Sequence, residues 1–439
     1  MSSEWPSVSI DEVCELIVDC VNKTAPIVDQ STPYRMIRTT NIRNGRIDLS
    51  SCRFVDAPTY AKWTRRATLQ YGDVLLTREA PIGEVGFVVE PQGLFLGQRV
   101  MQYRADPKVL SPRFLLFAFL SPALQDQFGS HEGSGSVVSH IRVGDCFKFK
   151  VKLPPLPVQT EIAALLGALD DRITLLRETN ATLEAIAQAL FKSWFVDFDP
   201  VRAKMEGRAP EGMDEATAAL FPDGFEESEL GLVPRGWRVL RLGDATERIT
   251  KGTTPTTLKR PFVDAGINFV KAESMTGDGG FIPEKFAFID NETHEILRRS
   301  QLQDADVLIS IAGTIGRIAV MTNDYLPANT NQAVALIRPL QHIFPSGLIN
   351  RFLRLGTSQQ QMREKVVQAV QANLSLGTLS DLKVVVPPAL VVGKLYESGL
   401  FQIDASWIAN DQRIRTLATL RDTLLPRLIS GQMRLPEVA

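Results

Sequence analysis

Guanidinium, amide and hydroxyl side chains gather in two stretches of the chain, and such groups hydrogen-bond the phosphate oxygens and base edges of nucleic acids. Residues 30–110 contain twelve basic and seven acidic residues, a net charge of +5. Residues 263–343 contain six basic and ten acidic residues, a net charge of −4. A nucleic-acid surface in this stretch would therefore require its basic side chains to lie together on one face. A solvated surface without special function is the alternative explanation for any single arginine.

Candidate contacts with nucleic acid are chosen by side-chain chemistry and by their expected position in loops. The first half of the chain supplies Arg38, Asn41, Arg43, Arg65, Arg66, Arg78, Gln98, Arg99 and His140. The second half supplies Lys271, Ser274, Arg298, Arg299, Thr314, Arg317, Asn331, Gln332 and Asn373.

Motifs of catalysis are missing from the sequence. There is no G-x-x-x-x-G-K-[ST] phosphate loop, no Asn-Pro-Pro-aromatic or Asp-Pro-Pro-aromatic tetrapeptide for a flipped base, no nucleophile elbow and no His-Glu-x-x-His. Pro222-Asp223 is not followed by the Glu-x-Lys of a metal nuclease, and the four histidines lie far apart. We therefore expect no catalytic centre, no cofactor and no metal site in this chain.

Composition limits the class of protein. With 439 residues, 44% of them hydrophobic, the chain should fold into two or three domains. Its 48 basic and 50 acidic residues nearly cancel, so net charge alone does not indicate a nucleic-acid partner. The four cysteines show no Cys-x-x-Cys spacing, and no apolar run approaches the ~20 residues of a membrane span. We expect a protein of the reducing cytoplasm.

An internal repeat runs through the chain. Residues 73–76 (Asp-Val-Leu-Leu) recur as 306–309 (Asp-Val-Leu-Ile), with 306 − 73 = 233, and the Arg-Arg pair at 65–66 recurs at 298–299 with the same offset. The offset also holds between Gly83 and Gly316, Gly144 and Gly377, and Pro154-Pro155 and Pro387-Pro388. A constant offset over some 90 residues indicates two copies of one domain.

Each copy is expected to consist of short strands followed by a helix. Runs of β-branched and other apolar residues at 73–77, 85–89, 307–311 and 333–337 are separated by Gly, Pro and Asn, as strands are. The prolines of residues 154–157 then interrupt the chain, and a long stretch without proline begins at Gln159, which predicts a helix.

Apolar residues in the expected helices follow a heptad, alternating in steps of three and four. The core positions of the first helix are Ile162, Leu166, Leu169, Ile173, Leu176, Asn180, Leu183, Ala187, Leu190 and Trp194. The second helix has Ile403, Trp407, Ile414, Leu417, Leu424 and Leu428 in the same phase, interrupted by polar Asn410 and Arg421. Two phase-matched helices favour a coiled coil in which Asn180 helps to fix the register; an amphipathic helix packed on its own domain is the alternative.

Connectivity makes such a pair antiparallel, because the first helix leads from one β-rich domain to the other and the second helix must return. The predicted architecture is α+β, with two β-rich domains separated by an antiparallel coiled coil of two long helices and related by a pseudo-two-fold repeat. The expected domains are a first β-rich domain (1–157), a first helical spacer (158–196), an acidic surface linker (197–236), a second β-rich domain (237–390), and a second helical spacer with a C-terminal tail (391–439).

The layout resembles the specificity subunit of type I restriction-modification enzymes. The stretches that carry the resemblance are Lys152–Ile162 and Leu190–Arg202 at the ends of the first spacer, Glu229–Trp237 at the opening of the second domain, and Leu424–Gly431 near the C-terminus. They span essentially the full chain. One departure is that the second diproline precedes Ala389-Leu-Val-Val-Gly393, where the first copy has Leu-Pro-Val-Gln-Thr160, so the start of the second spacer is less well defined.

The resemblance implies a subunit without a catalytic site, in which each β-rich domain is a target-recognition domain for one half of a split DNA sequence and the coiled coil sets the gap. It implies as partners double-stranded DNA, two methyltransferase subunits and two restriction subunits, with S-adenosylmethionine, ATP and magnesium bound by those partners. Thr160 to Trp194 is 35 residues, or about 52 Å of helix, which would separate the half-sites by roughly one DNA turn, 34–36 Å. A coiled-coil adaptor that binds proteins is the other hypothesis, because near-neutral charge permits it.

Overall fold

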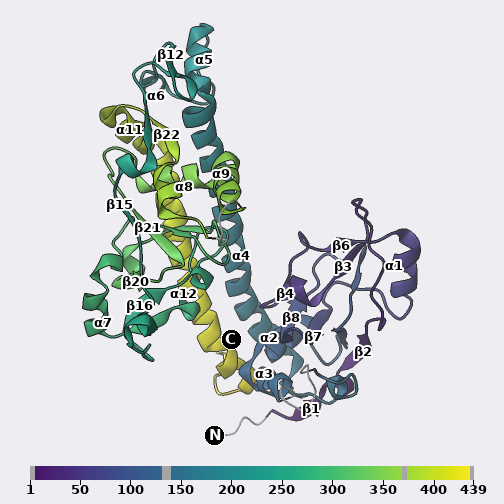
Figure 1. Ribbon diagram of the computed structural model, residues 1–439. Helices are drawn as coiled ribbons and strands as arrows, with labels where there is room; N and C mark the ends of the chain where they lie inside the picture. Colours follow the sequence, from purple (N-terminus) through teal and green to yellow (C-terminus); the bar gives the residue numbers. More distant parts are fainter. Residues whose placement is uncertain (1–4, 131–139, 368–372, 436–439) are drawn as a thin grey trace. The chain divides into compact units, whose positions relative to one another are not determined.

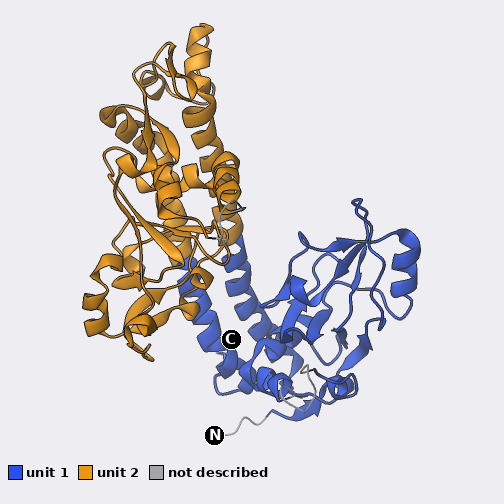
Figure 2. Cartoon of the chain, viewed as in Figure 1, with its two compact units in different colours: residues 1–175, 413–439 blue, residues 176–412 orange. Residues whose placement is uncertain are grey.

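The chain forms two compact units in a computed structural model that describes residues 5–130, 140–367 and 373–435 (Figures 1 and 2). The first unit comprises residues 1–175 and 413–439, and the second comprises residues 176–412. Two long helices, α4 (Leu156–Lys192) and α12 (Phe401–Ser430), contribute segments to both units.

The first unit contains a four-stranded antiparallel sheet in the order β2-β10-β7-β8 and a three-stranded sheet in the order β6-β3-β9, whose β3 and β9 are parallel. In addition, β1 pairs with β11 and β4 with β5. The strands are β1 (Ser7–Ser9), β2 (Cys14–Asp19), β3 (Arg35–Ile37), β4 (Ile42–Arg43), β5 (Arg46–Ile47), β6 (Arg53–Phe54), β7 (Val74–Arg78), β8 (Ile82–Phe87), β9 (Leu94–Leu96), β10 (Val100–Ala105) and β11 (Lys150–Lys152). The short helices are α1 (Ala57–Trp63), α2 (Pro112–Leu120) and α3 (Pro122–Gly129).

The second unit repeats this topology, with sheets in the orders β15-β21-β18-β19 and β17-β16-β20, a parallel β16-β20 pair, and a separate β14-β22 pair. Its strands are β12 (Phe225–Ser228), β13 (Gly231–Pro234), β14 (Arg238–Arg241), β15 (Thr246–Lys251), β16 (Ile267–Val270), β17 (Ala287–Ile289), β18 (Val307–Ser310), β19 (Ile318–Val320), β20 (Ala328–Thr330), β21 (Val334–Pro339) and β22 (Lys383–Val386). Its helices are α5 (Asp199–Met205), α6 (Glu215–Ala218), α7 (Asn291–Ile296), α8 (Ser346–Arg354), α9 (Gly356–Val367), α10 (Leu376–Ser380) and α11 (Ala389–Leu395). The internal repeat in the sequence is thus a repeat of the fold.

The four-stranded sheet of each unit is covered on both faces, which explains its uninterrupted apolar runs. In β7, Val74 and Leu76 pack in one apolar cluster with Phe114 of α2, whereas Leu75 packs in another with Ile37 of β3. In β18, Val307 and Ile309 likewise belong to a different cluster from Leu308. Successive side chains of a strand point to opposite faces, so a strand between two apolar layers is apolar throughout.

The segment 197–236 differs from its prediction as a surface linker. Its acidic residues are largely exposed, but Phe198, Val201 and Phe221 are buried in the main apolar cluster of the second unit, together with Trp237. The segment forms α5, α6 and the β12-β13 hairpin. Burial of the apolar residues interspersed among the carboxylates makes this segment part of the second unit's core, which charge counting could not indicate.

The two long helices pair, as the heptads predict, and they are antiparallel, as the connectivity of the chain requires. In the second unit Asn180 of α4 contacts Asn410 of α12. Farther along α4, Gln188 contacts Arg351, and Arg351 binds Asp404, which comes before Asn410 on α12. Later positions of α4 therefore lie beside earlier positions of α12. The predicted core residues of both helices are buried or half-buried, and α4 begins at Leu156, with Pro157 in its first turn. Proline is tolerated there because amides of the first turn have no partner within the helix.

Candidate nucleic-acid interface

One end of the four-stranded sheet of the first unit collects most of its candidate residues. At this end β7 finishes at Arg78 and β10 begins after Arg99, and the two are joined by a hydrogen bond from Arg78 N to Arg99 O of 2.8 Å. Ile141 N donates to Arg78 O at 3.0 Å, which brings His140 alongside, and Gly97 N donates to Ile37 O at 2.7 Å, which brings Arg38 to Gln98. We call Arg38, Arg78, Gln98, Arg99 and His140 the first edge.

The second unit builds the same end of its sheet from equivalent residues. Ile311 N donates to Ala333 O at 2.8 Å, and Leu374 N donates to Ile311 O at 2.9 Å. The parallel strands β16 and β20 end side by side, with Val270 opposite Thr330, so Lys271 and Asn331 follow at the same point. We call Lys271, Asn331, Gln332 and Asn373 the second edge. Lys271 and Asn373 correspond to Arg38 and His140 at the offset of 233, whereas the sheet register sets Gln332 at the position of Gln98 and Ala333 at that of Arg99, an offset of 234.

Side chains of the first edge are guanidinium-rich and partly anchored. Arg38 and Arg78 donate to the backbone oxygens of Ser51 and Ile141, each at 3.0 Å. Arg99, which has a left-handed backbone with φ of 70°, forms an ion pair with Glu79 (Nε to Oε2, 2.9 Å). The Gln98 amide hydrogen-bonds with the Thr24 hydroxyl at 3.1 Å. A non-glycine residue with positive φ costs free energy, so the surrounding contacts hold Arg99 in that conformation.

The second edge carries three amides and a lysine, and no guanidinium group. Asn331 accepts a hydrogen bond from Ala333 N at 3.1 Å, and Gln332 accepts one from Thr254 N at 3.2 Å. Lys271 forms an ion pair with Glu273 at 2.8 Å, and Asn373 is exposed. Both edges therefore present hydrogen-bonding groups on the same framework, but the first has the stronger positive charge.

The turns beside the edges hold further candidates. Arg43 lies 3.7 Å from Glu84 (Nε to Oε1) and donates to Thr39 O at 2.8 Å. Arg317 donates to Met275 O at 2.9 Å, and Thr314 is exposed in the β18-β19 turn. The paired arginines of the sequence repeat, 65–66 and 298–299, lie next to the ends of β2 and β15, because Arg66 contacts Asp19 and Arg299 contacts Thr250.

Two candidates are corrected by the structure. Asn41 is 1% exposed, its amide oxygen accepts from Arg38 N at 2.9 Å, and its amide nitrogen donates to Ser51 Oγ at 2.8 Å. Ser274 is 0% exposed, and its hydroxyl accepts from Lys271 N at 3.3 Å and donates to Lys285 O at 2.9 Å. These equivalent residues hold the turns after β3 and β16 and cannot reach a nucleic acid without breaking those bonds, so the prediction of direct contact was wrong for both.

Sequence reasoning missed an ion pair that each unit buries at the opposite end of its sheet. Asp73 binds Arg104 with oxygen–nitrogen distances of 2.8 and 2.9 Å, and Asp306 binds Arg338 with distances of 2.8 and 2.7 Å. The hydrogen bonds with these carboxylates raise the pKa of each arginine above its ordinary value. The recurrence of Asp73 as Asp306, at the offset of 233, was the signal in the sequence for this ion pair. Its arginine partner could not be identified from the sequence, because the register of the neighbouring strand determines which residue lies beside the aspartate.

The coiled coil pairs its polar interruptions. Asn410 Nδ2 donates to Asn180 Oδ1 at 2.9 Å, Asn180 Nδ2 donates to Trp407 O at 3.2 Å, and both asparagines are less than 10% exposed. In the first unit Arg421 binds Asp170 at 2.8 Å. Paired polar groups at core positions favour one register, because any other register would bury them without partners.

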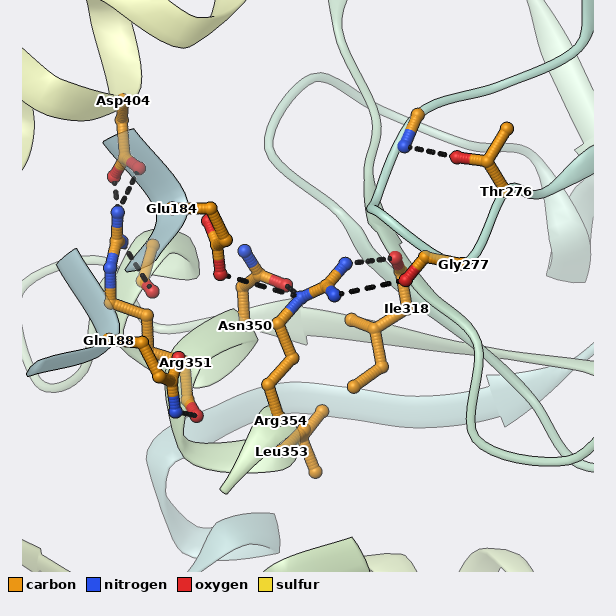
Figure 3. A network of polar contacts seen from close by, with 12 residues as sticks. Glu184, Gln188, Thr276, Gly277, Ile318, Asn350, Arg351, Leu353, Arg354 and Asp404 are labelled. Carbon is orange, nitrogen blue, oxygen red and sulfur yellow. Dashed lines mark hydrogen bonds and ion pairs between the residues drawn. The ribbon is translucent and has the colours of Figure 1, made fainter. Parts of the chain in front are cut away.

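A polar network attaches the second β-rich domain to both long helices (Figure 3). Arg351 of α8 is fully buried and donates to Asp404 of α12 and to Gly347 O, while Gln188 of α4 donates to Arg351 O at 3.0 Å. Arg354 donates to Ile318 O at 2.7 Å, and its Nε lies 3.8 Å from Glu184 Oε1. Burial raises the pKa of Glu184 and lowers that of Arg354, because each loses hydration in its charged form.

Side chains that could hold a metal do not gather. In residues 5–130, 140–367 and 373–435, no group of three or more His, Cys, Asp or Glu side chains is arranged to bind a metal ion. Burial raises the pKa of the Cys52 and Cys146 thiols to about 11, so both are protonated at neutral pH and are poor metal ligands. In the same described ranges, no helix has the length and apolar character needed to cross a bilayer.

Comparison with known proteins gives one consistent family. Residues 2–185 and 234–417 match the profile described as Type I restriction modification DNA specificity domain. The Type I restriction enzyme HindI specificity subunit of Haemophilus influenzae is 25% identical over 424 residues, covering 86% of this chain and 89% of the relative. The Type I restriction enzyme MjaIX specificity subunit of Methanocaldococcus jannaschii is 24% identical over 381 residues, covering 84% of this chain and 79% of the relative. The crystal structure of a type I restriction-modification S subunit from M. genitalium shares the fold, with a TM-score of 0.52, 16% identity, and coverage of 97% of this chain and 96% of that one.

Proposed function

The chain belongs to the type I restriction modification DNA specificity family, and from this membership we propose that it selects the DNA sequence on which a type I restriction-modification complex acts. It is a non-catalytic specificity subunit, as members of this family are. Chemistry on DNA therefore belongs to the partner subunits, and this chain contributes recognition.

We propose that each unit reads one half of a split DNA sequence. The observation that carries this proposal is that the same sheet end is built twice, from equivalent backbone hydrogen bonds, with different side chains at its tip. Equivalent frameworks with different hydrogen-bonding groups suit two half-sites of different sequence, because side-chain chemistry at base edges determines which base is accepted. The first edge offers mainly guanidinium groups, which favour guanine and phosphate, and the second offers mainly amides.

Specificity subunits of this class assemble with DNA and with methyltransferase and restriction subunits. For this chain we propose two methyltransferase subunits, which use S-adenosylmethionine to methylate an adenine in each half-site, and two restriction subunits, which use ATP and magnesium. We further propose that the complex works in the cytoplasm, where the host DNA is found.

Long-read detection of modified bases in host DNA, with and without this chain, tests the proposal directly. We expect a bipartite methylated sequence that disappears when the chain is deleted. Unchanged methylation would contradict a role in specificity.

A protein-binding adaptor is the competing hypothesis, and salt dependence separates the two. For the complex with its methyltransferase partner, the logarithm of DNA affinity should fall linearly with the logarithm of salt concentration, since phosphate contacts release counterions. An adaptor would show no sequence-dependent DNA binding at any salt concentration.

A further inference from the structure

A pair of consecutive arginines occupies the same position in both units. Arg65-Arg66 and Arg298-Arg299 are separated by the repeat offset, 298 − 65 = 233. Each pair follows a short helix, α1 or α7, whose first turn is capped by an aspartate that accepts from a threonine amide three residues later. The capping aspartates, Asp56 and Asp290, lie 234 residues apart, so the segment from cap to pair is one residue shorter in the second unit. From the pairs onward the offset of 233 holds, as far as Asp73 and Asp306 just before β7 and β18.

The second arginine of each pair is anchored to the first strand of the four-stranded sheet. Arg66 forms an ion pair with Asp19, the last residue of β2, and donates to Cys20 O at 3.3 Å. Arg299 Nε donates to Thr250 Oγ1 of β15 at 2.7 Å. The two anchors differ chemically, one a carboxylate and the other a hydroxyl, yet both tie the second arginine to the strand end beside the edge.

The first arginine of each pair is exposed and uncommitted. Within the described parts of the chain, neither Arg65 nor Arg298 makes an ion pair or a side-chain hydrogen bond. Other arginines near the edges are already engaged, as Arg99 is with Glu79 and Arg78 is with a backbone oxygen. Arg65 and Arg298 thus keep all of their guanidinium donors for a ligand, and a phosphate diester matches those donors in charge and geometry.

We infer that Arg65 and Arg298 are equivalent contacts to the DNA backbone, one in each half-site, and that Arg66 and Arg299 are positioning residues that fix the turn carrying them. This inference rests on the proposed function, since it assigns a contact within DNA recognition. It predicts that the two half-sites share one backbone contact even though their bases are read by different edges. Phosphate contacts carry no base information, so the shared contact would set register without restricting sequence.

Salt-dependent binding by the complex of the full chain with its methyltransferase partner tests the inference. Arg65→Gln and Arg298→Gln should each reduce the slope of log affinity against log salt by about 0.9. From 50 to 200 mM salt, wild type should then lose about 3.5-fold more affinity than either variant, since 4 to the power 0.9 is about 3.5. Arg65→Lys and Arg298→Lys keep the charge and should keep the wild-type slope.

Matched controls remove a charge at the far end of each sheet. Lys108→Gln follows the end of β10, and Arg241→Gln precedes β15; both residues are exposed. Neither control should change the slope. If Arg65→Gln and Arg298→Gln behave like these controls, the assignment is wrong.

Ethylation interference assigns each arginine to its half-site and tests the anchors. Ethylating individual phosphates should reveal one interfering phosphate in each half-site for wild type, lost from one half-site with Arg65→Gln and from the other with Arg298→Gln. Thr250→Val keeps every charge but removes the acceptor of Arg299, so it should weaken the same phosphate contact as Arg298→Gln, and Thr250→Ser should restore it. Loss at both half-sites from either single variant would overturn the inference.

Failure of the proposed function would look different. In that case the wild-type complex itself would show no sequence-dependent and salt-dependent DNA binding, and the inference would fall with it. Specific binding by wild type together with unchanged slopes in the variants would reject only the assignment of these arginines.

Discussion

Removing one member of the Asn180–Asn410 pair should destabilise the second unit, whereas removing both should not. In Asn410→Leu, the side-chain oxygen of Asn180 loses its donor at 2.9 Å while the residue remains buried, at 7% exposure. An unsatisfied buried acceptor costs about 1–3 kcal/mol. In Asn180→Leu, the Asn410 amide and the Trp407 carbonyl both lose a partner, so a similar or larger loss is expected. The double variant leaves neither asparagine amide buried and should lie within about 1 kcal/mol of wild type, or above it.

Urea unfolding followed by tryptophan fluorescence measures these differences, because Trp194, Trp237 and Trp407 all belong to the second unit. Gln402→Leu, at an exposed position of α12, is the matched control and should change stability by no more than about 0.5 kcal/mol. The coupling energy from the double-mutant cycle should be about 1–6 kcal/mol in magnitude, because both single losses largely disappear in the double variant. Single losses that simply add in the double variant, to within about 0.5 kcal/mol, would refute the pairing as a source of register.

Three further predictions follow from the buried charges and the helices. Asp306→Ala leaves Arg338 buried without its carboxylate and should lower the unfolding free energy of the second unit by about 3–5 kcal/mol in urea titrations; a loss below about 1 kcal/mol would contradict the role of this ion pair. Burial raises the pKa of Glu184 in the folded protein. The contribution of this residue to the free energy of unfolding is therefore fully present below about pH 4.3, the pKa of an unperturbed glutamate, and falls as pH rises through the raised pKa. Glu184→Gln should remove that fall in a series of urea midpoints from pH 4 to 7, and an unchanged pH profile would show that Glu184 does not cause it. Seven residues inserted after Thr179, together with seven after Asn410 to keep both helix pairings, add about 10.5 Å of helix. The gap between the methylated half-sites should lengthen by about three base pairs, at ~3.4 Å each, and both half-sites should stay unchanged. An altered base in either half-site would count against the helices as the spacer.

The helical part of the fold could be predicted from the sequence because its signal is local. Heptad spacing identified the buried face of α4 and α12, and the polar residues at its core positions proved to be paired, Asn180 with Asn410 and Arg421 with Asp170. The two-copy organisation was equally accessible, since a constant offset needs no knowledge of packing. The parallel strand pairs were not predicted, because β3 and β9 are joined by a register that no local pattern encodes.

The candidate site was predictable in outline but not residue by residue. Repeat position led to residues at the corresponding sheet end of each unit, although the sheet register matches Gln98 with Gln332, one residue beyond the offset of 233. Side-chain chemistry could not distinguish an exposed amide from one used in a turn, so Asn41 was chosen with the same reasoning as Asn373, although Asn41 is buried. Burial depends on tertiary contacts, and the acidic segment 197–236 was misjudged for the same reason: its apolar residues become informative only once the cluster around Trp237 is known.

The two ends of each four-stranded sheet differ in burial, and under the proposed function they separate the residues that stabilise the sheet from those that contact DNA. At the far end both units keep an ion pair between an arginine and a buried carboxylate, and breaking the fully buried pair of the second unit costs about 3–5 kcal/mol. At the edge the first unit exposes Arg99, whose position in the second unit is occupied by Ala333, and the second unit exposes Gln332. Substitutions at exposed surface positions usually change stability by no more than about 0.5 kcal/mol. The hydrogen-bonding groups of the edge can therefore differ between the two units with little effect on the folded state. If the edges contact DNA as proposed, one fold can read two half-sites of different sequence, because the residues that stabilise the sheet lie at the opposite end from the edge.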